Sequence, residues 1–171
     1  MALTFSVVYT ATTTLWDFGW FDLTRFKVDG PPSERQDARR VLAEFLRDQI
    51  SQRAFCNQGH WGDPVKHHGP FSHHALVAEW FRPLTGEQFS ELIQVVLNSP
   101  EFMEPPNSEQ REPLESWSAS VRARGDDVFA LDVPDQTEIK VDWDQVWVVY
   151  QEFATVSREG EELSIGVIGY D

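Results

Sequence analysis

The sequence has a single cysteine and no long run of apolar residues. One cysteine cannot form an internal disulfide, so a reducing, cytoplasmic setting is the expectation. The apolar runs extend over only a few residues, far short of the roughly 20 that a membrane-spanning helix needs. The first nine residues have neither a basic region nor a small-residue cleavage site, so the sequence predicts no secretion signal.

The chain also lacks the short motifs of nucleotide binding and of nucleophilic catalysis. It has no Walker loop, no dinucleotide fingerprint and no serine in a nucleophile elbow. The thiol of Cys56 follows the predicted C-terminus of a helix, which is the end that does not favour a thiolate. We therefore predict no catalytic residue, and a protein without enzymatic activity fits the sequence better than an enzyme.

Charge is abundant and unevenly placed along the 171 residues, which have a net charge of −14. Residues 1–99 contain nine Lys/Arg and 11 Asp/Glu, whereas residues 100–171 contain five and 17. Such an excess of carboxylates repels nucleic acid and anionic membranes, and it attracts a basic protein. Solubility alone is the alternative explanation for an acidic chain.

Hydrophobic periodicity predicts an α+β fold in a single domain of residues 1–171. Two amphipathic helices are expected, one begun by a capping box of Ser33 and Gln36, the other by Thr85 and Gln88. Residues 98–115 hold four prolines and five glutamates, which predicts a long Pro/Glu-rich loop. Alternation predicts strands over residues 3–10, 21–28, 75–81, 117–123, 128–133, 145–156 and 163–170, with a turn or irregular segment between the first two.

The order of these elements predicts a mainly antiparallel sheet of about six or seven strands. The two helices would both pack on one face of this sheet. Glycine in the last strand, at Gly166 and Gly169, indicates either a bulge or a close approach of another group to the backbone.

All five histidines and Cys56 fall between residues 56 and 74. Imidazole and thiolate are zinc ligands, so Cys56, His60, His67 and His73 are candidates for a metal site, and zinc is the only cofactor considered. The ligand spacing matches no known zinc signature. A solvated loop and a loop that gains charge near pH 6 therefore stay open as alternatives.

Two groups of residues are candidates for partner binding. The run from Leu15 to Asp22 places Trp16, Phe18 and Trp20 around a glycine, and exposed aromatic side chains beside carboxylates are typical of an interface. The alternative is that these rings form one end of the core. The second group is acidic and consists of Asp126, Asp127, Asp142 and Asp144. These carboxylates serve either to bind a basic cleft or to protect strand edges from pairing.

In general character, a small acidic chain with one cysteine and no catalytic motif resembles bacterial immunity proteins. The sequence thus predicts a non-enzymatic binding protein, an immunity-type or antidote-type inhibitor of a basic toxin or nuclease. The alternative is a metal-binding protein, or a metal-dependent hydrolase, that uses residues 56–74. Nothing in the sequence predicts the oligomeric state.

Overall fold

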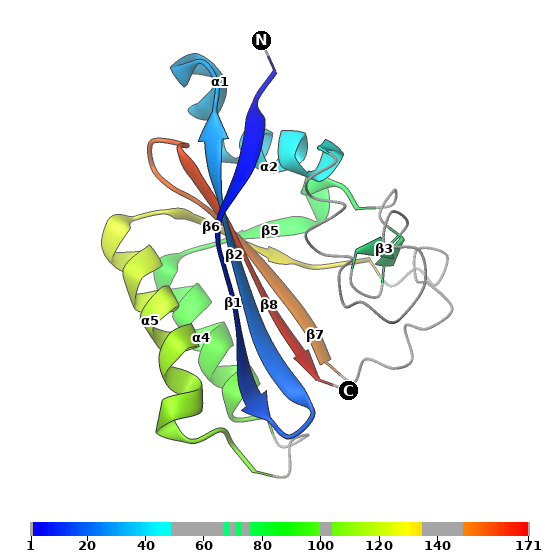
Figure 1. The fold of residues 1–171 in the computed structure, drawn as a ribbon, viewed down its shortest axis with the longest axis vertical. Helices are drawn as coiled ribbons and strands as arrows, with labels where there is room; N and C mark the ends of the chain where they lie inside the picture. The colour runs from blue at the N-terminus through cyan, green and yellow to red at the C-terminus, as the bar shows by residue number, and fades with distance from the viewer. Residues whose placement is uncertain are drawn as a thin grey trace.

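A computed structural model describes residues 2–48, 67–68, 71–72, 76–99, 104–134 and 149–170 (Figure 1). The strands are β1 (Thr4–Trp16), β2 (Gly19–Asp29), β3 (His67–His68), β4 (Phe71–Ser72), β5 (Phe81–Leu84), β6 (Asp127–Leu131), β7 (Val149–Val156) and β8 (Glu162–Tyr170). The helices are α1 (Pro32–Arg35), α2 (Ala38–Arg47), α4 (Gly86–Leu97), α5 (Ser108–Arg124) and the short 3₁₀ helix η2 (Ala78–Trp80).

Six strands form one sheet in the order β1-β2-β8-β7-β6-β5, and all neighbours in it are antiparallel. Strands β3 and β4 form a separate two-stranded sheet. The α+β class and the antiparallel sheet are therefore confirmed. Within the described ranges, no helix is long and apolar enough to cross a membrane.

The helices pack on both faces of the sheet, not on one face as the sequence analysis predicted. Along β8, Leu163, Ile165 and Val167 join the core beneath α2, while Ile168 joins the core beneath α4 and α5. Neighbouring side chains of a strand point to opposite faces, so a strand that is apolar at nearly every position needs cover on both sides. The apolar side chains on both faces of the central strands are therefore buried only if helices cover each face.

Each helical layer has its own core. Beneath α2, the buried residues include Val41, Leu42, Phe45, Phe26 and Val28. Beneath α4 and α5, they include Phe89, Ile93, Leu114, Trp117, Val121, Phe21 and Leu23. Helices α4 and α5 lie side by side along the sheet (Figure 1).

Strand β1 is longer than predicted, because residues 10–16 extend it to a two-residue turn instead of forming an irregular segment. A bulge at Val8 shifts the register, so Val7 lies opposite Phe26 and Tyr9 lies opposite Arg25. These two partners point to different faces of β2. The bulge therefore moves the odd-numbered residues of β1 from the α2 face to the α5 face.

Helix α5 replaces two predicted features, the second half of the loop 98–115 and a strand over 117–123. It begins with a capping box, in which the Asn107 side chain accepts from the Gln110 N–H at 3.0 Å and the Gln110 side chain accepts from the Asn107 N–H at 2.8 Å. Gly125, with φ of 69°, ends it in the left-handed conformation. Pro113, one of the four prolines on which the predicted loop was based, stands inside this helix.

The other helix starts were predicted with mixed success. The capping box of Thr85 and Gln88 is confirmed, with N···O distances of 3.1 and 2.9 Å. The predicted cap at Ser33 is wrong: α2 starts from Asp37, whose carboxylate accepts from the backbone N–H groups of Arg39 and Arg40. An aspartate at this position satisfies two orphan donors, which leaves the preceding residues to form the separate turn α1.

Two predicted strands are only partly tested or are displaced. The strand predicted over 75–81 is wrong for its described part, because Ala78–Trp80 form η2 and β5 begins only at Phe81. The strand predicted over 145–156 is found from Val149 onward, and its first four residues lie outside the described residues.

Candidate functional site

The aromatic residues of the β1–β2 turn have very different exposures. Trp16 is buried, with 7% of its surface exposed, and its ring packs edge-on against Tyr170 at 6.1 Å. Phe18 is 66% exposed at the tip of the turn, and Trp20 is half-buried on β2. A Cβ at Gly19 would lie 2.4 Å from Cε3 of Trp16, so this glycine is needed for the ring to pack. The burial of Trp16 argues against its direct contact with a partner.

The acidic candidates are separated from this turn. The Asp126 side chain is 2% exposed and accepts from Nε of Arg124 at 3.0 Å. This hydrogen bond raises the pKa of Arg124, and the negative charge of Asp126 adds to the effect. Asp127 is exposed, but it pairs with Val156 at the end of the sheet opposite the β1–β2 turn. Asp142 and Asp144 lie outside the described residues.

Most of the candidate metal ligands cannot be placed, because Cys56, His60 and His73 lie outside the described residues. The backbone of His67 belongs to β3, where it pairs with Ser72. No group of three or more His, Cys, Asp and Glu side chains suited to a metal occurs among the described residues.

A buried carboxylate that the sequence analysis missed lies beside the end of the histidine-rich stretch. Glu152 on β7 is fully buried, and its Oε2 accepts from the Tyr150 hydroxyl at 2.8 Å. The Phe71 ring of β4 contacts the Tyr150 ring at 5.6 Å and 81°. Part of the histidine-rich stretch therefore packs onto this polar pair. A single acidic residue in a strand rich in apolar and aromatic side chains was the only signal in the sequence.

Helices α4 and α5, with the residues just before α5, present an acidic surface. We define the acidic helix layer as five exposed glutamates: Glu87, Glu91, Glu104, Glu109 and Glu112. None of the five forms an ion pair with another described residue. Helix α4 contains no lysine or arginine at all. The layer therefore keeps its negative charge available to a partner.

Arg111, the basic residue nearest in sequence to these glutamates, is engaged within the helix layer. Its Nε lies 3.1 Å from Oε1 of Glu115, and its Nη2 lies 2.6 Å from Oε1 of Gln94. The pKa of Glu115 is lowered, chiefly by a hydrogen bond from Gln94. Burial opposes this effect, and the hydrogen bond and the charge of the Arg111 guanidinium lower the pKa further. Arg111 thus balances Glu115 and not the acidic helix layer.

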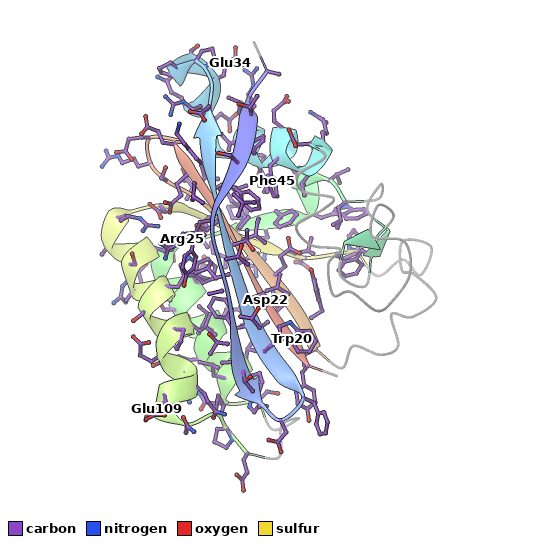
Figure 2. All side chains as sticks on the ribbon, in the orientation of Figure 1. Trp20, Asp22, Arg25, Glu34, Phe45 and Glu109 are labelled. Carbon is purple, nitrogen blue, oxygen red and sulfur yellow. The ribbon has the colours of Figure 1, made fainter. Side chains whose placement is uncertain are left out.

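A groove of about 490 Å³ runs between β1 and α5. Its floor is apolar and includes Phe21, Leu23 and Trp117. Arg25 stands at one end, with its guanidinium carbon 5.1 Å from the centre of the Tyr9 ring, and Glu112 stands on α5. Figure 2 shows Arg25 well above Glu109, which marks the start of α5. The groove is therefore polarised, with a cation near Tyr9 and a carboxylate toward the start of α5.

Comparison with known proteins found only distant similarity. No family model matches the sequence, and no curated protein does either. Two crystal structures of citrus MAF1 show weak similarity. The one in space group P 31 2 1 has a TM-score of 0.40 and 11% identity, over 77% of this chain and 66% of that chain, which is just under two thirds. The one in space group C 2 2 21 has a TM-score of 0.48 and 8% identity, over 92% and 91%. At these values neither structure informs the function.

Proposed function

We propose that this chain is a non-enzymatic binding protein, an immunity-type or antidote-type inhibitor whose partner is a basic toxin or nuclease. The acidic helix layer is the observation that supports the proposal. Carboxylates that form no ion pair with a described residue, held in a packed helical layer, attract a cationic surface and speed its association. The exposed glutamates cost the fold little, because each remains hydrated until a partner arrives.

Aromatic and acidic residues outside the layer complete the proposed contact surface. Phe18 is a large exposed ring at the tip of the two-residue β1–β2 turn, and large aromatic side chains often anchor an interface. Trp20, Asp127, Asp142 and Asp144 stay in the proposal as further partner-binding residues. The side chains of Trp16 and Asp126, which were predicted with them, are buried.

Neutralising two residues of the acidic helix layer tests the proposal. We expect the double variant Glu91→Gln/Glu109→Gln to bind the basic partner captured at low salt about tenfold more weakly, mainly through slower association. Its free energy of unfolding should stay within about 0.5 kcal/mol of the wild type, because both side chains are exposed. Surface plasmon resonance over a salt series and urea denaturation provide the two measurements.

The matched control is Glu79→Gln/Glu159→Gln, which removes the same charge from exposed positions outside the layer. Binding by this control should remain close to that of the wild type. Equal weakening of binding in both double variants would assign the effect to net charge alone and remove the acidic helix layer as a binding surface. Failure to capture any basic protein in a salt-sensitive manner would remove the function itself.

One observation favours a second candidate, a metal-binding protein or metal-dependent hydrolase that uses residues 56–74. The Phe71–Tyr150 contact joins β4 to the tyrosine whose hydroxyl donates to the buried carboxylate of Glu152, and glutamate side chains are seldom fully buried. Elemental analysis of protein purified without a histidine tag decides the matter. Less than about a tenth of an equivalent of zinc, iron, nickel or copper, with no rise in melting temperature on adding metal, would exclude this candidate.

A further inference from the structure

We propose that β1 and the groove beside it form a docking edge, which accepts an extended basic segment of the partner as an additional strand of the sheet. This inference rests on the proposed function, because it assumes that the partner is basic. The inference goes beyond the proposed function in naming β1 as the place of binding and strand addition as the mode of binding.

The two edges of the sheet are built differently. Strand β5 has only four residues, and it carries Arg82 and Pro83, the charged and proline residues that block pairing with another chain. Strand β1 has 13 residues, and none of them is charged, proline or glycine. Within the described residues β1 pairs only with β2. The sheet is therefore protected at one edge and open at the other.

Strand β1 also exposes large hydrophobic side chains, as protein interfaces often do. Val7, Val8 and Tyr9 are consecutive and are 48%, 57% and 47% exposed. After the bulge at Val8, β1 pairs regularly with β2 from Tyr9 opposite Arg25 to Thr14 opposite Trp20. Alternate residues of this stretch direct their N–H and C=O groups outward, which is the template that an added strand needs.

The groove determines the chemistry of the added strand. Tyr9, Ala11 and Thr13 line it from β1, so alternate side chains of a strand paired with β1 would point along the same face toward α5. There they meet Glu112, which is exposed and makes no ion pair with a described residue. Lysine or arginine is the complementary side chain at that end. The guanidinium of Arg25 occupies the Tyr9 end, which favours a carbonyl or carboxylate there.

Charge also decides between a basic partner and a second copy of this chain. Pairing β1 with β1 of another copy brings no cation to Glu112, because β1 has no charged residue. It also brings a second chain with a net charge of −14 close to the first. A basic segment brings a cation to Glu112 and is attracted by the negative charge of the chain. Self-association is therefore an outcome that the experiment must exclude, and not the proposed occupant.

The probe is a synthetic peptide that alternates lysine with threonine, compared with the same peptide carrying glutamate for lysine. Amide hydrogen exchange of the full chain at low salt should show protection of residues 9–14 by the lysine peptide only. Glu112→Lys should weaken binding about fivefold. The control Glu159→Lys makes the same charge change on the exposed β7–β8 turn and should have a smaller effect.

Proline variants test the strand edge itself. Because N–H direction alternates, only one of Thr12→Pro and Thr13→Pro removes a backbone hydrogen bond to β2. Thr12→Pro in addition removes the side-chain hydrogen bond that Thr12 donates to Asp22 at 2.5 Å. The variant that keeps the wild-type melting temperature is the edge variant, and it should bind the lysine peptide at least tenfold more weakly. Should both variants lose stability, exchange protection of residues 9–14 in the wild type still provides the test.

Four outcomes would overturn the inference: no binding of the lysine peptide, equal protection by both peptides, unchanged binding by the edge variant, or protection of β1 that rises with protein concentration when no peptide is present. The last outcome would assign the edge to a second copy. Capture of a basic partner that depends on Glu91 and Glu109 but not on the edge variant would leave the proposed function intact. The two hypotheses thus fail separately.

Discussion

Replacing Trp117 with alanine is expected to lower the free energy of unfolding by about 3–5 kcal/mol, the usual cost of removing a large buried aromatic ring. Trp117 is 2% exposed, and its ring lies between Phe21 at 5.6 Å and Phe89 at 5.2 Å. It thereby joins α5 to β2 and to α4. Urea denaturation followed by circular dichroism measures the loss. Val95→Ala, at a 66% exposed position on α4, is the control and should change stability by less than about 0.5 kcal/mol.

The contact of Trp117 with Gly166 makes the same prediction sharper. A Cβ on Gly166 would lie 2.4 Å from both Cη2 and Cζ3 of the indole, so Gly166→Ala should cost about 1–3 kcal/mol through overpacking. In the Trp117→Ala background that cost should largely disappear, which gives a coupling of at least about 1 kcal/mol. Additive effects of the two substitutions would show that the ring does not rest on this glycine.

Gly160→Ala should destabilise the protein by about 2–4 kcal/mol, while Gly125→Ala should cost only about 1–2 kcal/mol. Both glycines are left-handed, with φ of 66° and 69°. They differ in their surroundings: a Cβ at Gly160 would lie 2.1 Å from the carbonyl oxygen of Arg35, whereas a Cβ at Gly125 would meet nothing within 4 Å. The difference between the two variants therefore isolates the close approach of α1 to the β7–β8 turn.

Thermal and urea denaturation of both alanine variants provide the measurement. Equal losses would mean that α1 moves away from the turn at little cost. In that event the Arg35–Glu161 ion pair, now at 3.0 Å, would break as well, and removing Arg35 would have no further effect in the Gly160→Ala background.

The fold could be predicted where the capping or turn residues and the pattern of apolar residues indicate the same element. The Thr85–Gln88 capping box and the C-terminal hairpin satisfy both, and the structure confirms them. Helix α5 was missed for a physical reason. Its buried residues Leu114, Trp117 and Val121 have helical spacing, but Ala119 and Ala123 complete an alternating pattern as well, and Pro113 conceals the start.

The candidate site depends on tertiary placement that no local pattern reports. The number of glutamates is visible in the sequence, but Glu109 and Glu112 lie in the same helical layer as Glu87 and Glu91 only because α5 packs beside α4. The groove requires a β1 that extends past Thr10, where the sequence analysis expected a turn. Glu152 was missed because a glutamate in a strand does not by itself reveal whether it faces water or the core.

The extra residue at Val8 lets one strand serve two separate hydrophobic interiors. Leu3 and Phe5 belong to the interior under α2, whereas Leu15 belongs to the one under α5, although all three have odd numbers. Without the insertion, the alternation of side chains would turn one end of β1 away from the core that it now joins. Deleting Val8 would therefore leave β1 able to pack either its first residues under α2 or its last residues under α5, but not both.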